Sequence, residues 1–311
     1  MYVALLSLGT YAYTPLAPEV SHFISLHGDL GYSAMLHNIA DQKPSTGMNT
    51  NIGVDYRLYH NHFLFSAGLE GMYQMNINLM DKLDVTIPML DTERDLFDMH
   101  VHVDKSRDMT HMVNVNVPLL FGGEWKRFYF LLGPKISLNV YGMTSSSAQF
   151  TTYGEYDRYY DDFYEMPNHQ FMSDREMKSG SLPISWNMNI MAHAEIGGRI
   201  GHMYKAKQFR IRPDKVRMYL AAYVDFGLLN IQRNHGGSPI FEFRETDKGV
   251  QFFIQPLMLS NLSDNAMVRN LNVGIKYTIA FELPKKGKSY IYDYNKVDRD
   301  FIKRGGNQMI K

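Results

Sequence analysis

The last regular segment of the chain, residues 270–283, alternates between apolar and polar positions without a break. One parity is apolar from Leu271 to Phe281, and the other is polar, small or charged. A strand of this length that is apolar on one side can cross hydrocarbon when it is tilted, and an aromatic residue near its end suits the membrane interface. A soluble edge strand shows the same alternation but seldom keeps it for so long. The pattern therefore predicts a strand of a transmembrane β-barrel.

The same period of two recurs in seven earlier parts of the chain. These segments are residues 22–34, 49–59, 63–79, 111–121, 127–141, 187–201 and 216–231. Together with the last segment they predict an all-β fold of eight antiparallel strands. Pro134 lies on the apolar parity of the fifth segment, where we expect a bulge or a local kink because proline lacks an N–H group.

The connections between these segments alternate in length. Short or moderate links fall at His60–Asn61, 122–126 and 202–215, whereas long polar links fall at 35–48, 80–110, 142–186 and 232–269. Short periplasmic turns opposite long external loops are typical of outer-membrane barrels, and an even strand number returns both ends to the periplasm. A soluble sandwich or a lipocalin-like barrel has no reason to alternate in this way. We therefore predict an eight-stranded antiparallel up-and-down transmembrane β-barrel over residues 20–283, with long external loops.

The two ends of the chain have a different character from the barrel. Residues 1–14 are apolar and then small or polar, which resembles the hydrophobic region and cleavage zone of a secretory signal peptide. The alternative is an N-terminal strand or a frayed end. Residues 284–311 are rich in charge, and we expect them to form a short periplasmic tail. No run of eighteen apolar residues occurs, so the sequence predicts no membrane-spanning helix.

Composition narrows the possible chemistry. The chain of 311 residues has no cysteine, which excludes a disulfide framework, a thiolate metal site and a thiol nucleophile. Lysine plus arginine equals aspartate plus glutamate at 32 each, so the overall charge gives no reason to expect nucleic acid as a partner. The 21 tyrosines and 18 phenylalanines, with a mean hydropathy of −0.30, suit a protein that is apolar only on alternate residues.

Two stretches carry a resemblance to a known family. Residues 117–137 contain Pro-Leu-Leu before a tight turn and Gly-Pro-Lys after it, and residues 274–281 read Gly-Ile-Lys-Tyr-Thr-Ile-Ala-Phe. The chain resembles the PorT-like, OmpA-like outer-membrane β-barrel family of Bacteroidota. The resemblance implies the outer membrane of a Gram-negative bacterium and a role in a secretion complex, such as type IX secretion, or in envelope assembly. The chain departs from the family by continuing past Phe281, which leaves the barrel-assembly signal internal.

The polar parity of the predicted strands defines what fills the barrel. We expect its interior to hold a network of charges, accompanied by His27 and His193. The members are Asp29, Asp55, Arg57, Glu70, Lys135, Glu195, Arg199, Arg217, Asp225, Lys276 and Glu282. Because eight strands enclose only enough space for side chains, and buried charges persist only when paired, we interpret this set as a salt-bridged plug. The alternative is a path for protons or ions.

Two polar groups invite a chemical interpretation. Asp98, His100, His102 and Asp104 alternate with the spacing of a metal site, but this pattern is more often a strand extended above the membrane. Ser106, Asp108 and His111 lie together near the predicted barrel rim, where a membrane hydrolase would place its nucleophile and base. Sequence proximity does not define a triad, so we expect no catalytic residue, no metal and no cofactor.

A tyrosine-rich and acidic stretch, residues 153–178, is a candidate recognition loop. Its candidate contact residues are Tyr153, Tyr156, Tyr159, Tyr160 and Tyr164. Tyrosine is enriched at recognition surfaces, although such a loop can also pack its aromatic residues against one another.

A basic group is expected at the opposite, periplasmic rim. It consists of Lys205, Lys207, Arg210, Arg212, Lys215, Lys285, Lys286 and Lys288. These residues would meet anionic lipid or an envelope protein, or would simply form a solvated turn.

The function predicted from the sequence is that of a non-enzymatic barrel. We expect a structural or partner-binding component of the envelope, surrounded by outer-membrane lipid. The alternatives are a barrel enzyme that acts on lipid or peptide, and a small pore.

Overall fold

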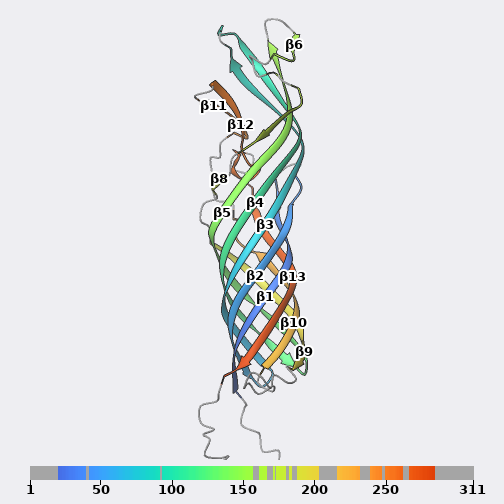
Figure 1. Ribbon diagram of the computed structural model, residues 1–311, viewed down its shortest axis with the longest axis vertical. Coiled ribbons are helices and arrows are strands. Elements are labelled where there is room, and N and C mark those ends of the chain that lie inside the picture. The colour runs from blue at the N-terminus through green and yellow to red at the C-terminus, as the bar shows by residue number, and fades with distance from the viewer. Residues whose placement is uncertain are drawn as a thin grey trace, which may run out of the picture.

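Eight strands form a closed ring in the computed structural model (Figure 1). Each pairs antiparallel with the next, and the last pairs with the first. In chain order they are β1 (Val20–His37), β2 (Ser45–His60), β3 (Phe63–Leu90), β4 (Leu96–Trp125), β5 (Phe128–Tyr156), β9 (Met188–His202), β10 (Val216–Gly227) and β13 (Val268–Glu282). The predicted eight-stranded antiparallel barrel is confirmed.

The structure describes most of the chain between residues 20 and 283. The described residues are 20–39, 42–91, 93–156, 161–166, 171, 173–179, 182–183, 188–202, 216–231, 239–246, 249–261 and 266–283. The predicted signal segment, the predicted tail, the basic rim group, Tyr159 and Tyr160 lie outside them. Among the residues described, no helix is long and apolar enough to cross a membrane.

Tight turns close one end of the barrel, here called the turn end. Asn61 and Lys126 adopt positive φ values of 56° and 57°, which suits two-residue hairpins. β4 continues to Trp125, so the turn predicted at residues 122–126 is wrong and lies instead at residues 126–127. β1 begins and β13 ends here, since Phe23 pairs with Glu282. The register passes through Pro134 without a shift, so the bulge expected there is also wrong, whereas the local kink stays a prediction.

The outer face of the ring carries a band of exposed apolar side chains. It includes Leu26, Leu30, Ile52, Val54, Leu69, Phe130, Leu132, Ile196, Leu220, Val224, Val273 and Ile275. Trp125 and Phe128 flank the band at the turn end, and Tyr73, Tyr141 and His111 flank it at the other end. Alternate residues on the same strands point inward, and most of them are polar. A closed ring that is apolar outside and polar inside matches a transmembrane barrel.

Three strands continue beyond the band and form a separate sheet, here called the extension. It consists of residues 78–90 of β3, 96–108 of β4 and 146–156 of β5. Two of the expected loops, residues 80–110 and 142–186, are therefore largely strand. The polarity of the faces reverses here: Val101 and Val103 point inward and are buried, whereas His102 and Asp104 point outward. Register shifts between Val103 and Lys105 and between Val113 and Asn114 accompany the change.

The inner face of the extension has its own hydrophobic core. Phe97, Met99, Val101, Phe150 and Phe171 are among its buried members. Short strands β6 (Asp161–Phe163), β7 (Arg175–Lys178) and β8 (Leu182–Pro183) pair with β5. A hairpin of β11 (Phe241–Thr246) and β12 (Gly249–Ile254), followed by the 3-10 helix η3 (Leu257–Leu259), contributes Phe241, Ile254 and Leu257 to this core. We call β11, β12 and η3 the cap.

The reversal of polarity along β3 can be tested with two arginines that both lie on the outward face of the strand. Leu69 is 58% exposed within the apolar band, and Thr86 is exposed in the extension. Leu69→Arg should block assembly, because arginine near the bilayer midplane costs about 2–4 kcal/mol, whereas Thr86→Arg should assemble normally. Heat-modifiable gel mobility of isolated membranes measures this. Equal assembly of both variants would contradict the placement of the band.

Candidate functional site

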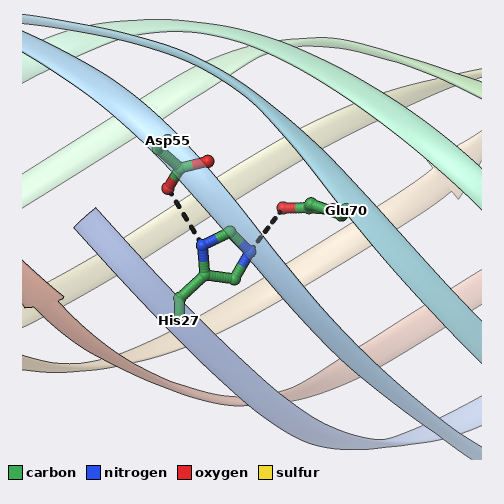
Figure 2. A group of neighbouring side chains, drawn as sticks. All are labelled: His27, Asp55 and Glu70. Atoms are coloured by element: carbon green, nitrogen blue, oxygen red, sulfur yellow. Dashed lines mark ion pairs between the residues drawn. The ribbon is translucent and has the colours of Figure 1, made fainter. Parts of the chain in front are cut away.

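His27 occupies the middle of the barrel interior between two carboxylates. Figure 2 shows its ring, from β1, between Asp55 of β2 and Glu70 of β3. Nδ1 lies 3.1 Å from an Asp55 oxygen, Nε2 lies 3.1 Å from a Glu70 oxygen, and all three side chains are buried. A carboxylate carries no hydrogen to donate, so an ionised carboxylate on each side favours a ring that is protonated at both nitrogens. The geometry therefore suits an imidazolium ion.

His193 of β9 repeats this arrangement on the other side of the barrel. Its Nδ1 donates to Asp225 of β10, and its Nε2 lies 3.3 Å from a Glu195 oxygen. Tyr223, also on β10, stacks against the His193 ring with centroids 6.2 Å apart. The hydroxyl of Tyr223 donates to Asp29 at 2.9 Å. The two histidines are thus equivalent elements of one polar layer.

Lysines connect the two halves of this layer across the barrel. Lys135 Nζ lies 2.9 Å from Glu70 and 3.0 Å from Asp225. Lys276 Nζ lies 3.2 Å from Glu195 and 3.6 Å from Glu70. Both lysines are buried, so their charges are compensated almost entirely by these carboxylates. We give the name charge layer to the group formed by the two histidines, their neighbouring carboxylates, the two lysines and Arg57.

The charges of the layer balance when both histidines are protonated. Its buried carboxylates are Asp29, Asp55, Glu70, Glu195 and Asp225, and its permanent cations are Arg57, Lys135 and Lys276. The cations number three and the carboxylates five, so two imidazolium ions complete the neutrality. An unbalanced charge in this low-dielectric interior is costly, and neutrality is the condition that makes the layer stable.

Glycines on the inward parity make room for these side chains. A Cβ atom at Gly53 would lie 2.6 Å from His27 Nε2, and one at Gly68 would lie 2.2 Å from an Asp55 oxygen. Both distances are shorter than van der Waals contact allows. The sequence marks these positions only as small residues on a polar parity, so their role becomes visible in the structure alone.

Aromatic residues close the barrel between the charge layer and the turn end. This floor consists of Phe23, Tyr59, Leu64, Leu120, Tyr129, Leu131, Tyr219, Ala221 and Ala280. The Tyr59 and Tyr219 hydroxyls lie 3.1 Å apart, and Tyr219 donates to Glu124 at 3.1 Å. The Arg57 guanidinium lies over the Tyr219 ring at 5.7 Å from its centroid. Cation–π and hydrogen-bond contacts therefore hold the floor together.

Amide side chains fill the barrel on the other side of the charge layer. They include Asn49, Asn51, Gln74, Asn76, Asn114, Asn116, Asn139, Asn189, Asn270 and Asn272. The side-chain amides of Asn116 and Asn189 have no hydrogen-bond partner among the described residues, and buried amides of this kind are commonly satisfied by water. Beyond them, Met35, Met112 and Val268 form an apolar layer below the cap. Apolar material thus bounds the polar interior at both ends.

The group of His27, Asp55 and Glu70 brings its donor atoms within 4.8 Å of one another, as metal ligands would. Cations of the protein already surround these donors. Arg57 lies 3.5 Å from Asp55, and Lys135 and Lys276 contact Glu70. A metal ion would have to displace them, and His27 would have to release a ring proton before it could act as a ligand. The arrangement fits an ion-pair network better than a metal site.

Three charged residues predicted for the interior lie at its edge. Arg199 and Arg217 are partly exposed at the turn end and contact Glu124 at 3.2 and 3.9 Å. Glu282 is partly exposed at the end of β13. The parity of these residues in the sequence predicted that they point inward, but it did not predict how far along the barrel axis they lie. Glu124, which binds both arginines and Tyr219, was missed because it lies in a segment expected to be a turn.

The side chains of the candidate triad lie on opposite faces of β4. Ser106 and Asp108 point inward and are buried, whereas His111 points outward and contacts the Tyr73 hydroxyl at 2.8 Å. Residues three apart on a strand face opposite sides, so these groups cannot act together.

The alternating acids and histidines of β4 lie on the outward face of the extension, as the strand interpretation expected. His100 contacts Glu155 at 3.1 Å, and His102 contacts Asp84 and Asp104.

A row of stacked rings crosses this outward face. His100 stacks on Tyr153 with centroids 4.7 Å apart, and Tyr153 stacks on Tyr164 at 5.0 Å. Tyr164 is exposed, and Thr86 contacts His100 at 3.1 Å. Tyr156 is different: it points inward, is buried, and stacks on Phe97. The tyrosine-rich stretch is therefore partly a strand, and Tyr156 belongs to the core of the extension.

Asp108 attaches the cap to the barrel wall. It lies beyond the flanking His111 on β4, outside the membrane-spanning part of the strand. Its carboxylate accepts a hydrogen bond from Ser146 and one from the Leu257 backbone N–H at 2.7 Å. Burial raises the pKa of Asp108 to about 6, against the opposing effect of these two hydrogen bonds. The sequence places Asp108 near the predicted barrel rim, but no local pattern indicates its partner on η3.

No protein-family model and no curated protein sequence matches the chain. Among solved structures, it is similar to Ail, the attachment invasion locus protein of Yersinia pestis, with 9% identity and a TM-score of 0.24 over 83% of this chain and 98% of that one. The outer membrane protease OmpT from Escherichia coli gives 6% and 0.24 over 86% and 98%. The TodX monoaromatic hydrocarbon channel gives 8% and 0.16 over 84% and 90%. These values carry no argument about site or function.

The charge layer predicts a strong effect of removing one lysine. Lys135→Met leaves Glu70 and Asp225 short of a cation and should cost about 3–5 kcal/mol of unfolding free energy. The double variant Lys135→Met with Glu70→Gln removes one charge of each sign and should recover part of this loss. Urea unfolding in lipid vesicles, followed by tryptophan fluorescence, measures both. A cost below about 1 kcal/mol for the single variant would contradict the network.

Asp108 predicts a pH dependence of cap attachment. Because its pKa of about 6 in the folded protein exceeds the ordinary value of 3.8, its contribution to stability is fully present below about pH 4 and is lost as the pH rises through 6. Asp108→Asn removes the charge, keeps an oxygen that accepts from the Leu257 N–H, and places an NH2 group that can donate to the Ser146 hydroxyl oxygen, so at pH 8 it should stabilise the cap by up to about 3 kcal/mol. Proteolysis of the cap in both proteins, compared at each pH, measures this. If the difference in proteolysis between the two proteins stayed constant from about pH 4 to pH 8, this pH dependence would be contradicted.

Proposed function

We propose that the protein is a non-enzymatic outer-membrane β-barrel that holds a binding surface outside the membrane. The observation that carries this proposal is the extension: three strands continue past the apolar band and build a sheet with its own hydrophobic core. A barrel that served only to anchor the chain would need no ordered sheet beyond the bilayer. An ordered sheet presents side chains in fixed positions, which lowers the entropy cost of binding.

The outward face of the extension supports a role in recognition. His100, Tyr153 and Tyr164 form the stacked row described above, and Glu155 and Thr86 hold His100 in place. Stacked rings with polar edges give a large contact area with few rotatable bonds. We assign the contact with a partner to this row, with Tyr164 as its most exposed ring.

The interior supports an anchor better than a pore or an enzyme. The aromatic floor and the apolar layer under the cap bound the polar space at both ends. His27 and His193 are enclosed with their carboxylates, away from any substrate in the membrane or outside it. The charges therefore serve packing in this proposal, and neither ion passage nor turnover is part of it.

The setting that we propose is the outer membrane of a Gram-negative bacterium. Barrels of that membrane typically have an even number of strands, with short turns at the end where the first strand begins and the last strand ends. The resemblance of residues 117–137 and 274–281 to the PorT-like family favours a secretion or assembly complex as the place where the partner is found.

Site-specific photocrosslinking in cells tests this function. A photoreactive amino acid at Tyr164 should give adducts with a protein, because this position faces the partner. The same group at Phe130, which is exposed in the apolar band, should give adducts with lipid only. Gel mobility and mass spectrometry distinguish the two. The proposal would be contradicted if Tyr164 gave only lipid adducts or none, and if the purified protein also turned over lipid or peptide.

A further inference from the structure

One edge of the extension has no neighbouring strand in the part of the chain that the structure describes. β3 pairs with β4 along its whole length, from Phe63 to Leu90, but with β2 only as far as Ile77. At the opposite edge of the sheet, β6, β7 and β8 all pair with β5. Residues 78–90 of β3 thus leave an edge along the side of the projecting hairpin (Figure 1).

The inward side chains at this edge are only partly covered. Their partners on β4, which are Phe97, Met99, Val101 and Val103, are buried. The β3 residues opposite them are half-buried and pack on the same core; these are Leu83, Val85, Ile87 and Met89. Neighbours in one apolar row differ in burial because β4 has a strand on both sides and β3 does not. A further strand beside β3 would complete the cover of the row.

The hairpin that carries the edge has an excess of acidic residues, and some of them point outward. The side chain of Asp84 is 79% exposed, and Asp104 lies one strand further in and is 54% exposed. The only cations on residues 82–104 are Lys82 and Arg94, against acids at Asp84, Asp91, Glu93, Asp95, Asp98 and Asp104. The outward residues of a strand added here would meet a negative field, which favours lysine or arginine.

We propose that the edge of β3 from Leu83 to Leu90 accepts an extended segment of a partner protein in which apolar residues alternate with basic ones. The backbone of that segment would continue the sheet, its apolar side chains would cover the row from Leu83 to Met89, and its basic side chains would face Asp84. This inference rests on the proposed function and names the partner's chemistry. Asp84 and Pro88 are the kind of edge residues that discourage unselective pairing.

A second copy of this chain is a poorer occupant of the same edge. Antiparallel pairing of two β3 edges would bring together two hairpins that each carry an excess of acid over residues 82–104, and like charges on facing strands are destabilising. The excess of acid favours a partner of opposite charge instead.

Synthetic peptides test the edge directly on the full chain in phospholipid nanodiscs. A peptide of about eight residues in which valine alternates with lysine has the length of an ordinary strand and should bind saturably by fluorescence anisotropy. The same peptide with glutamate in place of lysine should not bind. Two N-methylated versions, one for each parity of backbone N–H, separate edge pairing from attraction to a surface. Only one parity faces β3, so one version should lose binding and the other should keep it.

Variants of the protein locate the binding. Asp84→Lys should weaken the valine–lysine peptide at least tenfold, whereas Glu176→Lys makes the same charge change on β7 at the opposite edge and should leave affinity within twofold. Equal binding of both N-methylated peptides, equal effects of both variants, absence of peptide binding, or a stable dimer that excludes the peptide would each overturn the inference. If the peptide fails while protein adducts at Tyr164 persist, the proposed function stands and only the edge inference fails.

Discussion

Eight strands enclose a space only as wide as the side chains that line it, so each charge inside must find its counter-charge across the barrel. Lys135 meets this requirement by joining Glu70 of β3 to Asp225 of β10, and Lys276 joins Glu195 of β9 to Glu70. The contacts connect strands that are not neighbours in the ring. They fix the cross-section of the barrel, and the floor and the amide layer are built on either side of them.

The second constraint is the change of solvent along three strands. Within the band the outward residues face hydrocarbon and the inward residues pair with one another, whereas in the extension the inward residues are apolar and the outward residues face water. β4 makes this change near Asp108, where the last buried carboxylate on the strand holds the cap through Leu257. The barrel thereby gives the extension a rigid base, and the cap gives its inner face a cover.

Much of the fold follows from the period of two in the sequence. All eight segments are strands, and the parity of residues such as Asp55, Glu70 and Lys135 gave their direction correctly. The extension escaped prediction because charged residues and histidines alternate with its apolar residues, so residues 83–89 and 97–103 looked like polar loop. The apolar residues keep the sequence parity of the band on β3 and β4, and the irregularities near Lys82 and Val103 turn them inward. Height within the barrel also escaped prediction: parity placed Arg217 with Lys276, yet Arg217 belongs to the floor. Contacts between distant segments, such as Asp108 with Leu257, leave no local pattern at all.

The central claim is that a closed interior supports an exposed sheet, and the absence of cysteine from the chain permits a direct test. Single cysteines at Asn116 in the interior, at Thr86 on the outward face of the extension and at Phe130 in the apolar band would be treated with a charged, membrane-impermeant thiol reagent on intact cells. The account predicts rapid labelling at position 86 and protection at 116 and 130. Labelling at 116 as fast as at 86 would show an open interior and contradict the account.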